Sequence, residues 1–381
     1  MQAERIKETS AAKALLRLRE SRRGQVRNKS SARCRCGKRS DTQFQLSIFE
    51  YYWHNECQYN PLHITFLGVF VSINNRVTDI LGTQYPIIQA PMGWIARAQL
   101  ASAVSNAGGM GIIETSSGEL DNIKIEVEKM RELTDKPFGM NVALSYVRGT
   151  NIVDFVIEQG IKFVTTSSGS PKVCTADFQQ AGIKVFHVVP TLEMAKKALD
   201  AGVDGLIVEG GEGGGFKNPS PVSSMVLLPL IRSFTDVPII AAGGISDGLS
   251  MAGAFAMGAE GVQMGTRMLS STDSPVHQNW KDAVVNTQET GTVFLNQESR
   301  PALRALRTER TSELAKLGSF NVGDHMSNLQ ELYFGGDMEA AIPLSGQVAG
   351  RIDEVKSVDQ IISETIADFN AIMQNLAKQY C

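Results

Sequence analysis

Residues 201–208 read AGVDGLIV and residues 257–264 read MGAEGVQM, so the chain repeats one phrase. Each copy passes through a glycine turn after an amphipathic stretch and runs into a short apolar segment, the pattern of a helix, a turn and a strand. Eight such apolar segments follow one another from residue 77 onward. The predicted strands are Pro86–Gln89, Gly111–Ile113, Phe138–Val142, Phe163–Thr165, Val185–Val188, Gly205–Val208, Pro238–Ala241 and Gly261–Met264.

These segments are nearly continuous apolar runs, which is typical of parallel strands buried on both faces. Eight alternations of strand and helix predict an α/β fold, the closed (β/α)8 or TIM barrel, and a doubly wound sheet is the rival architecture. The repeated phrase favours the barrel. The predicted intervening helices include Ala98–Ala107, Leu120–Leu133, Ile152–Gln159, Leu192–Ala201 and Gly248–Met257.

The residues after the eighth strand carry further helical patterns. They cover Ser274–Thr290, Ala302–Leu317, Asn328–Phe334 and Asp353–Leu376. We therefore expect a barrel over residues 76–270 and a small helical cap, inserted after strand eight, over residues 271–350. This cap would carry the substrate region, and a C-terminal helix in residues 351–381 would close the barrel wall.

The N-terminal stretch differs from the rest in charge. Residues 1–40 hold 13 Lys and Arg against 3 Asp and Glu, a net of +10 in a chain of net −3, so the remainder carries −13. An acidic body argues against nucleic acid as a partner. We interpret residues 1–75 as a basic, disordered extension, with an organelle-targeting arm as the alternative. The apolar run Leu62–Ile73 is shorter than the roughly 20 residues that span a bilayer, so no membrane partner is expected.

Composition and cysteine usage indicate the compartment. The chain is 43% hydrophobic and 20% charged, as in soluble globular proteins. Five cysteines without a small-domain framework suggest a reducing, cytoplasmic location. Cys34 and Cys36 are not followed by a second pair at zinc-finger spacing, so no metal site is predicted.

A Gly-Gly pair and a Gly-Thr pair follow the last two predicted strands. Gly243-Gly244 comes after strand seven and Gly265-Thr266 after strand eight. At the carboxyl ends of adjacent barrel strands, such residues let backbone N–H groups approach a phosphate. A single pair is more often a tight turn, but two pairs at these strand ends favour a phosphate cradle. A phosphorylated ligand of another class in the same cradle remains an alternative.

The glycine-rich run from Gly210 to Gly215 follows strand six. A loop that lacks side chains can lie flat against a planar ring, whereas the simpler interpretation is a flexible loop.

In this order, five phrases resemble the nitronate monooxygenase (2-nitropropane dioxygenase) family and its relatives, the flavin-dependent enoyl-acyl-carrier-protein reductases. The phrases are Gln89–Met92, Phe138–Val142, Glu209–Phe216, Ala241–Ile245 and Met264–Arg267. The resemblance implies an FMN cofactor held in the barrel, with the flavin supplying the redox chemistry. The cofactor contacts it implies are Ala90, Pro91, Met92, Asn141, Thr166, Glu209, Gly214, Gly215, Gly243, Gly244, Gly265 and Thr266.

One residue departs from the family pattern. The family's glycine loop usually ends in a histidine that serves as acid or base, and Phe216 stands at that position here. His187, at the end of strand five, is the candidate catalytic residue, although it could equally be a hydrogen-bonding partner. A nitronate is already an anion and needs no base, whereas a neutral nitroalkane does. The resemblance with this departure predicts FMN-dependent oxidation of alkyl nitronates by oxygen.

Two other functions remain open on the sequence. One is an NAD(P)H-dependent flavin reductase that acts on enoyl thioesters or quinones. The other is a barrel that binds flavin without catalysis. In each enzymatic case the partners are a small-molecule substrate and either oxygen or NAD(P)H, and a homodimer is left open.

Four arginines recur after residue 299 at three- and four-residue spacing. If this stretch is a helix, they would share a face that could hold an anionic substrate, although such a face is more often solvated. They are Arg300, Arg304, Arg307 and Arg310.

Overall fold

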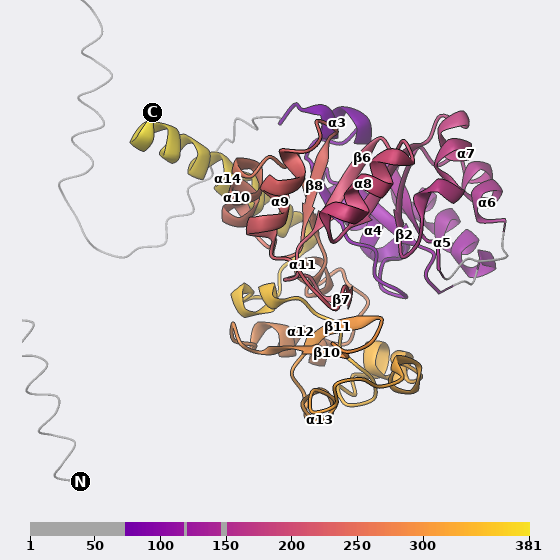
Figure 1. Cartoon of the computed structure of the whole chain (residues 1–381), viewed down its shortest axis with the longest axis vertical. Coiled ribbons are helices and arrows are strands. Elements are labelled where there is room, and N and C mark those ends of the chain that lie inside the picture. Colours follow the sequence, from indigo (N-terminus) through magenta and orange to yellow (C-terminus); the bar gives the residue numbers. More distant parts are fainter. Residues whose placement is uncertain (1–72, 118–119, 146–150) are drawn as a thin grey trace, which may run out of the picture. The chain divides into compact units, whose positions relative to one another are not determined.

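A computed structural model describes residues 73–117, 120–145 and 151–381. The extension predicted over residues 1–75 lies outside the described residues except for its last three. From Asn75 onward the chain forms strands and helices in regular alternation, with a cap gathered at one end of the barrel (Figure 1).

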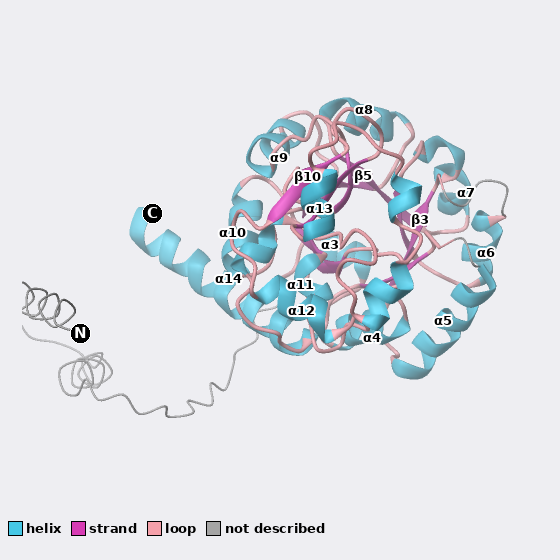
Figure 2. Cartoon of the chain, turned by 90° about the horizontal axis from the view of Figure 1, so that it is seen from below, coloured by secondary structure: helices cyan, strands magenta, loops and turns pink. Residues whose placement is uncertain are grey.

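Eight parallel strands form a nearly closed barrel, which confirms all eight predicted strands and the fold class. The sheet order is β1-β9-β8-β6-β5-β4-β3-β2, and a bridge between Ile88 and Met110 joins β1 to β2. Figure 2 looks onto this ring of strands with the helices around it. The strands are β1 Ile87–Gln89, β2 Gly111–Glu114, β3 Phe138–Ala143, β4 Phe163–Ser167, β5 Lys184–Val189, β6 Gly205–Glu209, β8 Ile239–Ala242 and β9 Gly261–Met264.

The repeated phrase has a physical cause in each position. Gly202 and Gly258 have φ of +78° and +98°, so they end the preceding helices in the left-handed region that glycine favours. A Cβ at Gly205 would lie 2.3 Å from the Phe186 ring, and one at Gly261 would lie 2.9 Å from Val77. The second glycine of each phrase therefore makes room for the apolar core at the base of the barrel.

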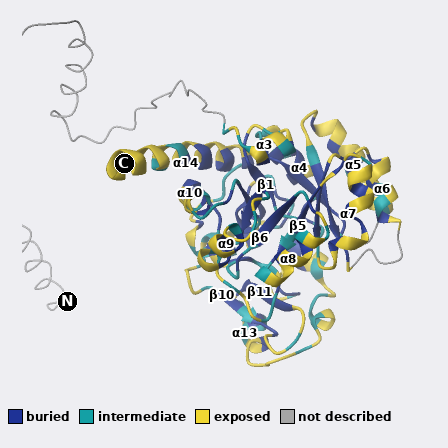
Figure 3. Ribbon diagram, turned by 45° about the horizontal axis from the view of Figure 1, so that its top comes forward, coloured by how far each residue is buried: buried dark blue, intermediate teal, exposed yellow. Residues whose placement is uncertain are grey.

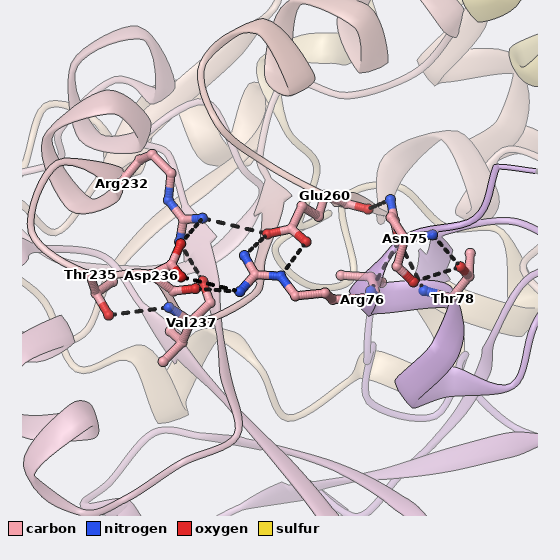
Figure 4. A network of polar contacts seen from close by, with 9 residues as sticks. Asn75, Arg76, Thr78, Arg232, Thr235, Asp236, Val237 and Glu260 are labelled. Atoms are coloured by element: carbon pink, nitrogen blue, oxygen red, sulfur yellow. Dashed lines mark hydrogen bonds and ion pairs between the residues drawn. The ribbon is translucent and has the colours of Figure 1, made fainter.

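A short helix closes that base. Helix α3 (Arg76–Leu81) packs Val77 and Leu81 into the same buried cluster as Ile88 and Phe186. The Arg76 guanidinium donates to the Glu260 carboxylate and to the Asp236 carbonyl, as Figure 4 shows. Because this network lies at the amino ends of the strands, it serves stability rather than chemistry.

The outer helices follow the strands in turn. They are α4 Ala98–Asn106, α5 Leu120–Leu133, α6 Ile152–Glu158, α7 Thr175–Gln180, α8 Leu192–Asp200, α9 Ser224–Arg232 and α10 Gly248–Ala256. The five predicted helices are all present within a residue of their predicted ends. The C-terminal helix α14 (Val358–Tyr380) contacts α10 and α4, the helices on either side of β9 in the barrel wall. Its buried residues all lie in its first half, and Figure 3 shows that its last turns are exposed.

The cap is not purely helical. Strands β10 (Thr292–Leu295), β11 (Ala302–Leu306) and β7 (Gly215–Lys217) form an antiparallel sheet. The helix predicted over Ala302–Leu317 is therefore wrong in its first half, and only α13 (Glu309–Leu314) is helical there. Because β11 is buried along its whole length, its apolar pattern does not alternate, and only its pairing with β10 and β7 identifies it as a strand.

The remaining cap elements are shorter than predicted. Helix α12 spans Gln278–Val285, within the predicted Ser274–Thr290, and the segment predicted over Asn328–Phe334 forms a π-helix at Glu331–Gly335. The short helix α11 (Thr266–Leu269) follows β9 before the cap and was not predicted. Two 3-10 turns lie at Val322–His325 and Gln347–Arg351.

Candidate active site

A cavity of about 670 Å³ lies at the carboxyl ends of the barrel strands, under the cap. This volume is within the range of roughly 300–1,000 Å³ for small-molecule and cofactor sites. Nearly all the residues predicted for the site line it. They are Ala90, Pro91, Met92, Asn141, His187, Glu209, Gly214, Gly215, Phe216, Gly243, Gly244, Gly265 and Thr266. Thr166 is the exception: it does not line the cavity but contacts His187, which does.

The loop after β1 is held in place by a buried carboxylate that the sequence did not identify. Glu114, at the end of β2, is fully buried and accepts hydrogen bonds from the backbone of Trp94 at 3.1 Å and from Arg97 Nε at 3.1 Å. Ser116 Oγ donates to it at 2.6 Å. Trp94 has φ of +65°, an unusual value for a large side chain. Glu114 thus fixes the turn that presents residues 90–93 to the cavity.

Gly243-Gly244 and Gly265-Thr266 follow the neighbouring strands β8 and β9. Gly243 and Gly244 have φ of +83° and +80°. A Cβ at Gly243 would lie 2.9 Å from the carbonyl oxygen of Gly210 and 3.0 Å from the nitrogen of Gly213. Both features require glycine at this position. The backbone there can approach a ligand closely, as an anion cradle requires.

A third segment completes this corner of the cavity. The backbone N–H of Gly346 donates to Thr266 Oγ1 at 2.9 Å, and Gln347 N–H donates to the carbonyl oxygen of Glu212 at 2.9 Å. Residues 344–348 of the cap therefore close over both the cradle and the glycine loop. The sequence did not predict this, because the contact joins residues 80 positions apart.

The glycine loop is packed tightly against the cap. A Cβ at Gly214 would lie 2.6 Å from the backbone of Ser345 and Gly346. Arg304 Nε donates to the Gly211 carbonyl at 3.0 Å, and the Glu212 carboxylate accepts from Ser224 N–H at 2.9 Å. The absence of side chains in this loop thus permits close approach of other backbone segments.

His187 is a neutral imidazole at physiological pH. Burial lowers its pKa to about 4, and its Nδ1 lies 2.8 Å from Thr166 Oγ1. Thr166 therefore orients the ring and leaves Nε2 for a ligand. Asn141 is also buried, and its Nδ2 donates to Thr165 Oγ1 at 2.9 Å.

An unsatisfied acceptor in the cavity wall shows that the site fits a polar ligand. Gln263 Oε1, on β9, is buried and has no hydrogen-bond partner among the described residues. A buried polar atom without a partner costs free energy, so a ligand donor is expected there. The glycines at two adjacent strand ends, the close-packed glycine loop and this acceptor fit a flavin, which combines an anionic group with a flat ring that carries an N–H donor.

Tyr333 is a second group that the sequence did not identify. It lines the cavity from the π-helix and lies 5.1 Å from the Trp280 ring, centre to centre. Burial, and to a smaller extent the Glu114 charge, raises the pKa of its hydroxyl far above the ordinary value. Tyr333 is therefore a hydrogen-bond donor and not a base. π-helices are frequent at functional sites.

The four arginines do not share a face. Arg304 lies on β11 and Arg310 on α13, while Arg300 lines the cavity from the turn before β11. Phe216 lines the cavity too, with 40% of its surface exposed. Among the described residues, no three His, Cys, Asp or Glu side chains are grouped to hold a metal ion. No helix in the described ranges is long and apolar enough to cross a bilayer.

Comparison with known proteins identifies the family. The nitronate monooxygenase family model matches residues 74–155 and 146–368. The chain is 30% identical to the (3aS,4S,5R,7aS)-5-hydroxy-7a-methyl-1-oxo-octahydro-1H-indene-4-carboxyl-CoA dehydrogenase of Mycobacterium tuberculosis, over 78% of this chain and 96% of that protein. It is 29% identical to a probable nitronate monooxygenase of Staphylococcus aureus, over 79% and 98%.

A solved structure agrees with this assignment. FabK from Thermotoga maritima matches with a TM-score of 0.77 and 35% identity, over 81% of this chain and 99% of that one. These relatives are flavin-dependent oxidoreductases. The chain belongs to the nitronate monooxygenase family and is a flavin-dependent oxidoreductase on a TIM barrel.

Proposed function

We propose that the protein uses FMN to oxidise alkyl nitronates with oxygen. The observation that carries this proposal is Phe216, which lines the cavity where the family usually has a histidine. His187, the other candidate base, has a pKa of about 4 and accepts a proton poorly at neutral pH. A substrate that enters as an anion needs neither group as a base.

FMN is the flavin that this cavity suits best. The cradle would consist of Gly243-Gly244 and Gly265-Thr266 at two adjacent strand ends, where barrel enzymes frequently bind a single phosphate. Gly243, Gly244, Gly265 and Thr266 would hold that phosphate. The remaining predicted contacts would lie along the rest of the cofactor. They are Ala90, Pro91, Met92, Asn141, Glu209, Gly214 and Gly215, with Thr166 acting through His187.

The bound flavin would accept electrons from the substrate and pass them to oxygen. The residues of the chain position and shield the reactants. Phe216 offers an apolar surface that excludes water, and Tyr333 provides a neutral O–H donor for an oxygen atom of the substrate. His187 is held by Thr166, so that its Nε2 can donate or accept one hydrogen bond without carrying charge.

A second candidate is oxidation or reduction of a thioester at the same flavin. The observations in its favour are the similarity to a CoA dehydrogenase and the match to FabK. A thioester reaction requires a group that takes up or releases a proton, and Tyr333 is the cavity's neutral donor. A barrel that binds flavin without catalysis is the remaining alternative.

The test is steady-state turnover by protein reconstituted with FMN. We expect oxygen consumption and nitrite release with propyl-2-nitronate, and at most about one hundredth of that kcat/KM with neutral 2-nitropropane. Comparable turnover of the two forms would contradict the proposal. Flavin reduction by NADH or NADPH, or by an acyl-CoA, without activity on nitronates would favour the thioester reaction. A flavin that none of these reduces would indicate a non-catalytic barrel.

A further inference from the structure

The glycine loop at residues 210–215 presents a physical problem that its sequence does not solve. Five of its six residues are glycine, so the unfolded loop has unusual conformational freedom, and only Glu212 has a side chain, which accepts from Ser224. Nevertheless the loop lines the cavity in one defined conformation, with Gly214 and Gly215 among the lining residues. Other groups must hold it.

The residues at the two ends of the loop form a buried ion pair. Glu209 ends β6 and Lys217 ends β7, and the Lys217 ammonium contacts the Glu209 carboxylate. The Lys217 side chain is 2% exposed and that of Glu209 is 24% exposed. Both residues line the cavity. The pair therefore joins the beginning of the loop directly to its end.

The loop also wraps closely around this pair. A Cβ at Gly213 would lie 2.6 Å from Lys217 Nζ and 2.9 Å from Glu209 Oε1. Glycine at position 213 thus allows the backbone to pass directly over the two charges. The family usually has a histidine at position 216, where this chain has Phe216. Here the adjacent Lys217 makes the polar contact with Glu209.

The pairing of β7 with β11 places Lys217 and Phe216 on opposite faces of the cap sheet. In β7, Lys217 is opposite Ala302 and Phe216 is opposite Leu303 of β11. Successive strand residues point to opposite faces, which agrees with an exposed Phe216 and a buried Lys217. Among the described residues that line the cavity, Arg300 is the other Lys or Arg side chain, and Lys217 is the one that pairs with Glu209.

We propose that Lys217 is a positioning residue, whose ion pair with Glu209 holds the glycine loop in the conformation that forms the flavin-facing wall of the cavity. The inference rests on the proposed placement of the flavin in this cavity. A buried ion pair contributes little net stability compared with apolar residues, but removing one partner leaves the other charge uncompensated. The pair is therefore better explained by the conformation it enforces than by the stability it adds.

The experiment compares two buried lysines. K217M removes the cation of the pair, and K281M removes a lysine that is 6% exposed, donates to the Ser274 carbonyl at 2.8 Å and does not line the cavity. K217R keeps the charge, and E209Q removes the opposite partner with little change in shape. Hydrogen exchange of the peptide covering residues 209–217 is measured by mass spectrometry on the apoprotein, and FMN affinity by flavin fluorescence.

We expect K217M to speed exchange in this peptide by at least about tenfold and to weaken FMN binding by a similar factor. K281M should change neither quantity, and K217R should restore most of both. The double variant K217M/E209Q should be no worse than K217M alone, because the two residues act as a pair. Unchanged exchange in K217M and E209Q, or an equal change in K281M, would overturn the proposal.

The two hypotheses fail in different ways. If exchange changes as expected but FMN does not bind to the wild-type protein, the loop has the proposed restraint and the proposed function is wrong. If the wild-type protein binds FMN and oxidises nitronates but K217M and E209Q leave the loop's exchange unchanged, the proposed function stands and the role of Lys217 is refuted. Should K217M fail to fold, E209Q and K217R decide the question.

Discussion

Gly243 is the position at which a single added methyl group tests the phosphate cradle. Its φ of +83° lies in the left-handed region, where a residue with a Cβ loses roughly 1–2 kcal/mol. The new Cβ would also lie 2.9 Å from the Gly210 carbonyl oxygen and 3.0 Å from the Gly213 nitrogen, so the glycine loop must move. We therefore expect G243A to lower the free energy of unfolding by about 2–3 kcal/mol. We also expect it to weaken FMN binding at least about tenfold, since the loop and cradle shift together.

Two other glycines separate the effect of backbone strain from the effect of contact with the glycine loop. Gly202 has φ of +78° but open space around its added Cβ, so G202A isolates the backbone strain and should lower stability by about 1 kcal/mol. Gly253 lies within α10 in open space, so G253A should raise stability by up to about 1 kcal/mol. Neither variant should change FMN affinity. Urea unfolding of the apoprotein and fluorescence titration with FMN measure the two quantities. Equal FMN affinity in G243A and G202A would refute the assignment of the cradle.

Three further predictions concern the cavity and its supports. F216H should raise kcat/KM for neutral 2-nitropropane by about a hundredfold and change that for the nitronate far less, whereas F216Q should do neither. E114Q should lower the free energy of unfolding by about 3 kcal/mol in urea melts, because Arg97 loses its buried anion; a loss below 1 kcal/mol would contradict this. Burial lowers the pKa of His187 to about 4 in the folded protein. Between pH 6.5 and about 4, the unfolded chain therefore binds one more proton than the folded chain. His187 therefore contributes up to about 3 kcal/mol of stability above pH 6.5, which is lost as the pH falls toward 4, and H187N should show a flatter profile.

Most of the barrel could be predicted because its determinants are local. Each strand is a short apolar run that ends in a turn, and both faces are buried, so its pattern depends little on which strand lies beside it. Gly243 was identifiable for the same reason, since a left-handed turn with a close approach selects glycine wherever it occurs. The position of Gly243 and Gly265 at adjacent strand ends then follows from the barrel topology.

The cap and the supports of the site depend on contacts between distant residues. Ala302–Leu306 is a strand because β10 and β7 pair with it, and β7 itself lies in the segment between the barrel strands β6 and β8. In the sequence, Glu114 is only a polar residue at the end of a predicted strand. Its role depends on its hydrogen bonds to Trp94 and Arg97 in the loop after β1, which only the structure shows. Gln263 did leave a signal, because it interrupts an apolar strand just before Gly265, but its missing partner is visible only in three dimensions. Lys217 was not identified from the sequence, because its role depends on a contact with Glu209 that only the structure shows.

The most direct test of the central claim is the visible spectrum of the purified protein under anaerobic conditions, recorded before and after propyl-2-nitronate is added. We predict flavin absorbance from FMN, confirmed by mass spectrometry of the released cofactor, and bleaching by the nitronate without NADH or NADPH. The absence of flavin absorbance even after reconstitution with FMN would contradict the account. Bleaching by a nicotinamide but not by the nitronate would contradict the proposed reaction.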